Sequence, residues 1–138
     1  MKFLGFIAAI LVVIAVVFVG GAENISVKWE EKSRAELKDA DLEADLYKNM
    51  KYVYTVGKYE RAMAMIEKYL ETYDVYDEYD KNESSDRIDD MNYYKAMTLD
   101  RMMQGTKARF AYKAYLERFP EGKNVKGAKD RLAELGNF

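Results

Sequence analysis

Apolar side chains recur every three or four residues along most of this chain, the spacing of one face of an α-helix. The pattern predicts helices over about 42–55, 59–73, 86–103, 107–119 and 125–135. Turn formers separate them, with Gly57 and Pro120 at two of the junctions. Ser33, followed three residues later by Glu36, has the spacing of a capping box. Residues 33–41 are therefore expected to form a short lead-in to the first of these helices.

Residues 74–86 interrupt the helical pattern. Their sequence, DVYDEYDKNESSD, has no apolar stripe and many turn formers, which indicates an acidic loop. The alternating oxygen-bearing side chains from Asp80 to Asp86 are spaced like the first ligands of an EF-hand calcium loop. However, Ser85 stands in place of the required glycine, and Met91 in place of the closing Glu. The sequence favours a solvated loop, with loose calcium binding by Asp77, Asp80 and Asp86 as the alternative, and no metal-ligating residue is predicted.

The N-terminus carries an uncharged run from Phe3 to Ala22. A helix of that length is about 30 Å long, the hydrocarbon thickness of a bilayer, so residues 3–22 are predicted to form a single transmembrane helix. Lys2 before the run and Glu23 after it predict a cytoplasmic N-terminus and a periplasmic or otherwise extracytoplasmic domain, as in a single-pass inner-membrane protein. A signal peptide cleaved after the small residues 20–22 is the alternative, and it would release a soluble periplasmic protein. The predicted organisation is an anchor at 1–22, a juxtamembrane lead-in at 23–41, and a helical domain at 42–138.

The composition narrows the function. The chain has no cysteine and no histidine, which excludes thiolate metal sites, thiol nucleophiles and Ser–His–Asp triads. No glycine-rich phosphate loop and no converging carboxylate pair is evident, so neither an enzyme nor a cofactor is predicted. The net charge of −2 offers no field that would attract nucleic acid. Residues 70–100 hold 10 acidic and 3 basic side chains, whereas residues 101–138 hold 4 acidic and 9 basic ones. This asymmetry suits docking to an oppositely charged partner or head-to-tail self-association.

An internal repeat appears when the helix over 59–73 is aligned with the helix over 107–119. The strings EKYLETYD and KAYLERFP align with an offset of 46 residues. Six inward positions of each helix share this offset and fall on one helical face. In the first copy they are Ala62, Met65, Ile66, Tyr69, Leu70 and Tyr73; in the second they are Ala108, Ala111, Tyr112, Tyr115, Leu116 and Phe119.

These residues resemble a tetratricopeptide repeat. Gly57, Tyr59 and Ala62 fit the G-x-Y-x-x-A pattern of that family, and Pro120 closes the second copy. The Tyr-Leu pair and the final aromatic-Pro are most similar to the periplasmic repeats of the Tol-Pal coordination protein and the outer-membrane assembly lipoprotein. The resemblance covers about residues 42–135. It implies an all-α array of about five helices behind the transmembrane helix, with residues 74–86 absorbing the excess over the family's usual period.

The resemblance also implies a binding surface, because the first helix of each tetratricopeptide repeat lines a concave, peptide-binding face. Tyr47 and Tyr93 are 46 residues apart, so an aromatic is repeated where a ligand would lie. The alternative is that both tyrosines pack inward. The candidate protein-binding residues are Tyr47, Lys51, Tyr54, Tyr93, Met97, Asp100 and Arg101.

The function predicted from the sequence is a membrane-anchored extracytoplasmic adaptor that binds protein partners and helps to assemble a membrane-associated complex. A small accessory subunit of a large membrane complex is the alternative, together with the cleaved periplasmic protein. The predicted partners are proteins in or at the membrane, with membrane attachment through residues 3–22 and no nucleic acid.

Overall fold

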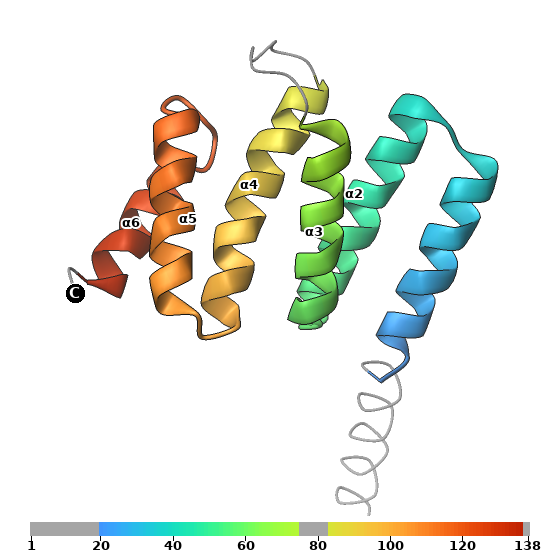
Figure 1. Ribbon diagram of the computed structural model, residues 1–138, viewed down its shortest axis with the longest axis horizontal. Coiled ribbons are helices and arrows are strands. Elements are labelled where there is room, and N and C mark those ends of the chain that lie inside the picture. Colours follow the sequence, from blue (N-terminus) through green and yellow to red (C-terminus); the bar gives the residue numbers. More distant parts are fainter. Residues whose placement is uncertain (1–19, 75–82, 137–138) are drawn as a thin grey trace, which may run out of the picture.

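The computed structural model describes residues 20–74 and 83–136, and all regular secondary structure in these residues is α-helical. A helical segment at 20–36 precedes α2. The helices are α2 (Asp39–Thr55), α3 (Tyr59–Tyr73), α4 (Glu83–Arg101), α5 (Gly105–Arg118) and α6 (Val125–Leu135). From α2 onward each helix packs against the next in an antiparallel row, and α2 also contacts α4 (Figure 1). The predicted all-α fold is confirmed, as is the helix at 59–73.

The structure contradicts the predicted transmembrane helix. Within residues 20–74 and 83–136, no helix is both long enough and apolar enough to cross a membrane. Residues 3–19 of the predicted span lie outside the described residues. Its last three residues, 20–22, are helical, and the helix continues through Glu23 and Glu30 to residue 36. Ala22 and Ser26 of this helix are fully buried. The single-pass localisation depended on this span and is corrected with it.

The predicted lead-in at 33–41 is also wrong. Ser33 lies in the last turn of the helical segment 20–36 and does not cap a helix start. Its hydroxyl lies 2.8 Å from the Trp29 carbonyl, which accepts its hydrogen bond one turn back, and 2.5 Å from a carboxylate oxygen of Asp45 on α2. The next helix begins at Asp39, after two residues that are not helical. The serine therefore contributes to packing between helices, which its capping-box spacing did not reveal.

The predicted acidic loop is shorter than its sequence suggested. Helix α4 begins at Glu83, so the end of the 74–86 stretch is helical. Residues 75–82 lie outside the described residues, and they include Asp77 and Asp80 of the calcium comparison.

The internal repeat predicted from the sequence is confirmed by backbone geometry. Gly57 and Met103, 46 residues apart, both have positive φ, 79° and 58°. Each donates its backbone N–H to the carbonyl three residues earlier, at 3.0 Å and 2.9 Å. The next residue of each turn, Lys58 or Gln104, donates to the carbonyl five residues earlier, at 3.1 Å and 2.9 Å. The turns α2–α3 and α4–α5 are therefore two copies of one structure.

Polar contacts inside the two hairpins repeat with the same offset. The Tyr69 hydroxyl donates to Glu43 at 2.5 Å, and 46 residues later the Tyr115 hydroxyl donates to Asp89 at 2.6 Å. Both carboxylates are nearly inaccessible, with 5% and 2% of their surface exposed. Burying a carboxylate without hydrogen bonds costs folding free energy. Each tyrosine hydroxyl therefore offsets part of that cost for its carboxylate. Arg87 of α4 also pairs with Glu43, at 3.2 Å, and so joins the first hairpin to the second.

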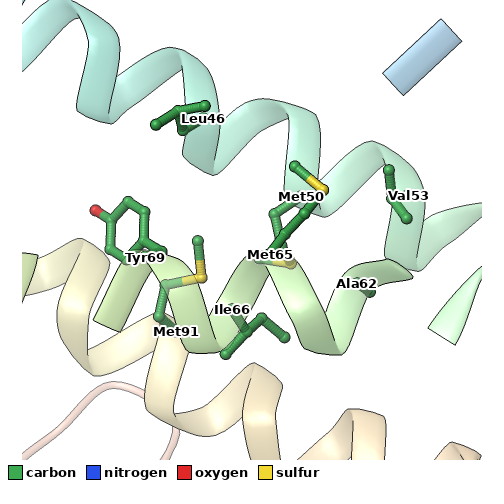
Figure 2. Close-up of a cluster of buried hydrophobic side chains, with 8 residues drawn as sticks. All are labelled: Leu46, Met50, Val53, Ala62, Met65, Ile66, Tyr69 and Met91. Atoms are coloured by element: carbon green, nitrogen blue, oxygen red, sulfur yellow. The ribbon is translucent and has the colours of Figure 1, made fainter. Parts of the chain in front are cut away.

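Two apolar clusters form the core. The first lies between α2, α3 and α4 (Figure 2), and the second between α4, α5 and α6. Ala62 and Ala108, two of the predicted inward positions, are both fully buried. The partly buried Ile88 of α4 packs against both clusters, so the core is continuous along the array.

The helical segment 20–36 shares part of the inward pattern of α3, 40 residues earlier, although Ile25, the counterpart of Met65, is 46% exposed. Ala22 corresponds to Ala62, and Trp29 corresponds to Tyr69. The Trp29 indole N–H donates to Asp45 of α2 at 2.6 Å. This bond joins the segment to α2.

Candidate functional site

A cleft with a volume of about 550 Å³ lies between α2, α4 and α6. We call it the α2–α4–α6 cleft. Its lining residues come from these three helices, the α4–α5 turn and α5: Tyr54, Tyr93, Met97, Asp100, Arg101, Met103, Tyr112, Gly127, Asp130, Arg131 and Glu134. A volume of this size falls in the range of ligand pockets, and the mixture of aromatic, thioether and charged side chains is typical of recognition surfaces.

The cleft brings together five of the seven candidate residues named from the sequence: Tyr54, Tyr93, Met97, Asp100 and Arg101. They come from both copies of the repeat. The other two, Tyr47 and Lys51, do not line the cleft. The Tyr47 hydroxyl donates a short hydrogen bond to Asp90 of α4, and its partly buried ring packs against the first apolar cluster. The Lys51 ammonium lies 5.0 Å from the centre of the Tyr47 ring. Tyr47 therefore takes the inward orientation that the sequence left open.

Contacts between aromatic rings fix the positions of the tyrosine side chains that line the cleft. The Tyr93 ring lies between Tyr112 and Tyr115, with ring centres 6.0 and 5.5 Å away. A Cβ atom on Gly127 of α6 would lie 2.6 Å from the Tyr93 hydroxyl, so only glycine leaves room for this ring beneath α6. On the α2 side, the Tyr54 ring packs edge-on against Tyr94 at 4.9 Å. Tyr93 is thus both a packing residue and a wall of the cleft.

Arg131 links α6 to α4 across the cleft. Its guanidinium donates two hydrogen bonds to Asp100, at 2.5 and 3.0 Å, and one to Glu134 at 2.6 Å. These bonds raise the pKa of Arg131, so the network stays charged. At the opposite wall, a hydrogen bond to Tyr54 raises the pKa of Arg101. Asp130 adds an exposed carboxylate to the same lining. Both charge signs are therefore available at the rim.

The pKa values of two tyrosines of the cleft are shifted further from neutral pH. Burial raises the pKa of Tyr112, and burial likewise raises that of Tyr93, so both phenols remain protonated. Among residues 20–74 and 83–136, no group of three or more acidic side chains is placed to hold a metal ion. The arrangement offers shape, apolar contact and hydrogen bonds to a ligand.

Sequence reasoning missed the α6 wall of the cleft. Gly127, Asp130, Arg131 and Glu134 are spaced three, four and seven residues apart, so they form one stripe of a helix. That spacing was visible in the sequence, but no binding residue was predicted on this helix. Met103 was also missed, because it lies in the turn between the paired helices.

The opposite charges of residues 70–100 and 101–138 meet within the chain. Asp74 pairs with Arg118 at 2.5 Å, Asp90 with Lys123 at 3.1 Å, and Asp100 with Arg131 at 2.5 Å. The first pair therefore joins the end of α3 to α5, and the other two hold α6 and the loop before it against α4.

Comparison with known proteins gives no match to this chain among protein-family models, curated proteins or solved structures.

Proposed function

We propose that this protein is a non-catalytic adaptor whose α2–α4–α6 cleft binds a peptide segment of a protein partner. The resemblance to tetratricopeptide repeats is part of the proposal. One observation supports the binding site: a single cleft of about 550 Å³ is lined by five of the candidate residues. The repeat register had predicted these residues on two different helices, α2 and α4.

The chemistry of the lining supports a peptide ligand. Tyrosine side chains give a large contact area at a low entropic cost, and their hydroxyls serve as hydrogen-bond donors or acceptors to a peptide backbone. Met97 and the 90% exposed Met103 add apolar contacts that adjust to the shape of a ligand. Arg101 and Asp130 at the rim suit a peptide with an apolar anchor side chain and flanking charges of either sign.

The experiment begins with selection of peptides from a random displayed library on the immobilised full chain. Binding of the selected peptide is then measured by calorimetry. The double variant Arg101→Ala/Met103→Gly removes one exposed cation and one exposed apolar side chain from the cleft. We expect it to weaken binding by tenfold or more, about 1.4 kcal/mol.

The matched control is Phe110→Ala/Lys113→Ala. It also removes one exposed large apolar side chain, 70% accessible, and one exposed cation, but both come from α5 and neither lines the cleft. Its affinity should stay within about twofold of the wild type. Equal losses in the two double variants, or a loss in the control alone, would refute the proposed site.

A further inference from the structure

A second, smaller pocket lies between the helical segment 20–36 and α3, and it shares no residue with the α2–α4–α6 cleft. Its volume is about 120 Å³. That equals the liquid volume of about four water molecules, enough for a branched group of about four carbons. We call it the Glu30 pocket, after the only carboxylate in its lining.

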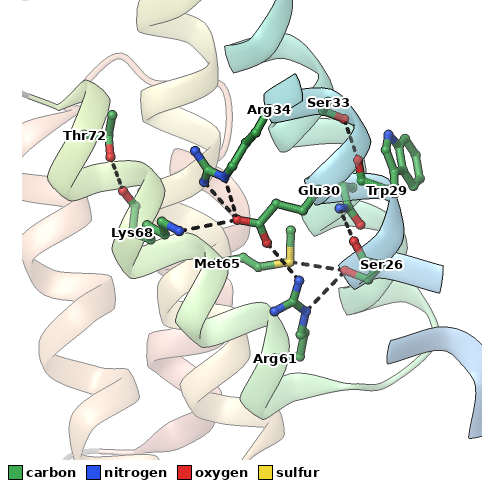
Figure 3. A network of polar contacts seen from close by, with 10 residues as sticks. Ser26, Trp29, Glu30, Ser33, Arg34, Arg61, Met65, Lys68 and Thr72 are labelled. Carbon is green, nitrogen blue, oxygen red and sulfur yellow. Dashed lines mark hydrogen bonds and ion pairs between the residues drawn. The ribbon is translucent and has the colours of Figure 1, made fainter. Parts of the chain in front are cut away.

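Three cations converge on Glu30 (Figure 3). Arg34, one turn later in the same helix, lies 2.9 Å from Glu30. Arg61 of α3 approaches the other carboxylate oxygen to 2.9 Å, and Lys68 of α3 lies at 3.4 Å. Burial alone would raise the pKa of Glu30, but these cations outweigh it and lower the pKa. With Glu30 ionised, the lining keeps a surplus of two positive charges.

The floor of the pocket is apolar. Leu46, Met65 and Tyr69 line it with 7%, 8% and 3% of their surface exposed. The side chains of Arg34 and Lys68 are 39% and 59% exposed, so the cations lie at the mouth. An apolar floor below a cationic mouth suits a ligand with an apolar end and an anionic end.

We propose that the Glu30 pocket binds an organic carboxylate that carries a small branched apolar group. The apolar group lies against Met65 and Leu46, and the carboxylate accepts hydrogen bonds from Arg34 and Lys68. A free short-chain acid and the C-terminal carboxylate of a polypeptide ending in an aliphatic residue present this same chemistry. Glu30 competes with the ligand for the same cations, because it already pairs with both. A guanidinium has five N–H groups and an ammonium three, so donors remain for the ligand.

The test is a titration of the full chain followed by the ¹³C-methyl NMR signal of Met65. Isovalerate should shift this signal saturably with millimolar affinity. The amide of isovalerate has the same apolar group without charge, and acetate has the charge without the apolar group; both should bind at least about tenfold more weakly. The tripeptide Gly-Gly-Leu, with a free or an amidated C-terminus, separates the two sources. Preference for the tripeptide acid over isovalerate assigns a polypeptide terminus, and the reverse assigns a free acid.

Two variants act in opposite directions. Arg34→Gln/Lys68→Gln should weaken isovalerate binding at least about tenfold, because the donors at the mouth are lost. Glu30→Gln should strengthen it several-fold, because the competing carboxylate is lost. The matched control Lys107→Gln/Lys113→Gln removes two exposed cations of α5 and should leave the affinity unchanged. Ala64→Trp, at an exposed position of the lining, should block the pocket without touching the charges.

Several results would overturn the inference. The first is the absence of a saturable Met65 shift with both isovalerate and the tripeptide acid up to about 10 mM. The others are equal binding of the amide, equal binding of acetate, and unchanged affinity in Arg34→Gln/Lys68→Gln. Thermal unfolding of each variant confirms that the domain compared is folded.

Discussion

Replacing Met103 by glycine should stabilise the protein. Met103 occupies the left-handed region at φ 58°, and its counterpart in the first hairpin is Gly57 at φ 79°. A residue with a Cβ is about 1–2 kcal/mol less stable in this region than in its preferred one. Glycine loses more backbone entropy on folding, which costs about 0.5–1 kcal/mol. The methionine side chain is 90% exposed, so its removal forfeits little apolar burial.

The net gain for Met103→Gly is therefore about 0.5–1 kcal/mol. For a domain of this size it corresponds to a rise in Tm of roughly 2–4 °C. Urea denaturation followed by circular dichroism gives the free energy of unfolding, and an unchanged m-value shows that the unfolded state is not altered.

Gly57→Met is the mirror experiment and should destabilise by a similar amount. A Cβ atom on Gly57 would meet only the Tyr59 hydroxyl, at 4.0 Å, so this change tests backbone strain rather than a clash. A lower stability of Met103→Gly would refute the equivalence of the two turns. Because Met103 also lines the α2–α4–α6 cleft, the stabilised variant should bind the selected peptide less tightly.

Three further substitutions test the second hairpin. Ala108→Leu should overpack a fully buried position and lower the free energy of unfolding by ~1–3 kcal/mol, whereas Ala114→Leu on the exposed face of α5 should change it by under ~0.5 kcal/mol. Gly122→Ala should destabilise by a similar ~1–3 kcal/mol, because the new Cβ would lie 2.6 Å from both Asp89 and the Tyr115 hydroxyl; a wild-type Tm would show that the loop moves freely. Burial, helped by the hydrogen bond to Asp89, raises the pKa of Tyr115. Unfolded tyrosines ionise near pH 10, so the free energy of unfolding should be full below about pH 10 and fall as the pH rises further. Tyr115→Phe should make that fall shallower, and an equally steep fall in denaturation curves at pH 8 and above would contradict the assignment.

The helices were predictable because each has an inward stripe at helical spacing, and the repeat was predictable because its two copies share residue types. Ala62 and Ala108 illustrate this: the sequence predicted both as inward positions, and both are fully buried. The extent of the first helix was not predictable from hydropathy. The apolar run ends at Ala22, but the helix continues through charged residues to residue 36. Its buried face there includes the polar Ser26 and Ser33, which a hydropathy pattern does not identify as buried.

The lining of the α2–α4–α6 cleft was predictable on α4 and only partly on α2. The register identified Tyr93 and Met97, which line the cleft. It also identified Tyr47, whose hydroxyl instead contacts Asp90 of α4. Tyr47 and Asp90 are 43 positions apart in the sequence. Helical spacing within one segment does not reveal a contact between two segments. The Glu30 pocket was missed for the same reason, since its cations come from two helices that the sequence assigned to different domains.

The most direct test of the adaptor function is to locate the site at which a selected peptide binds. The ¹³C-methyl signals of Met97 and Met103 report on the α2–α4–α6 cleft, and those of Met63 and Met65 report on α3. We expect the peptide to shift Met97 and Met103 saturably, with the dissociation constant measured by calorimetry, and to leave Met63 and Met65 unchanged. Shifts at Met63 and Met65 with Met97 and Met103 unmoved would contradict the proposed function.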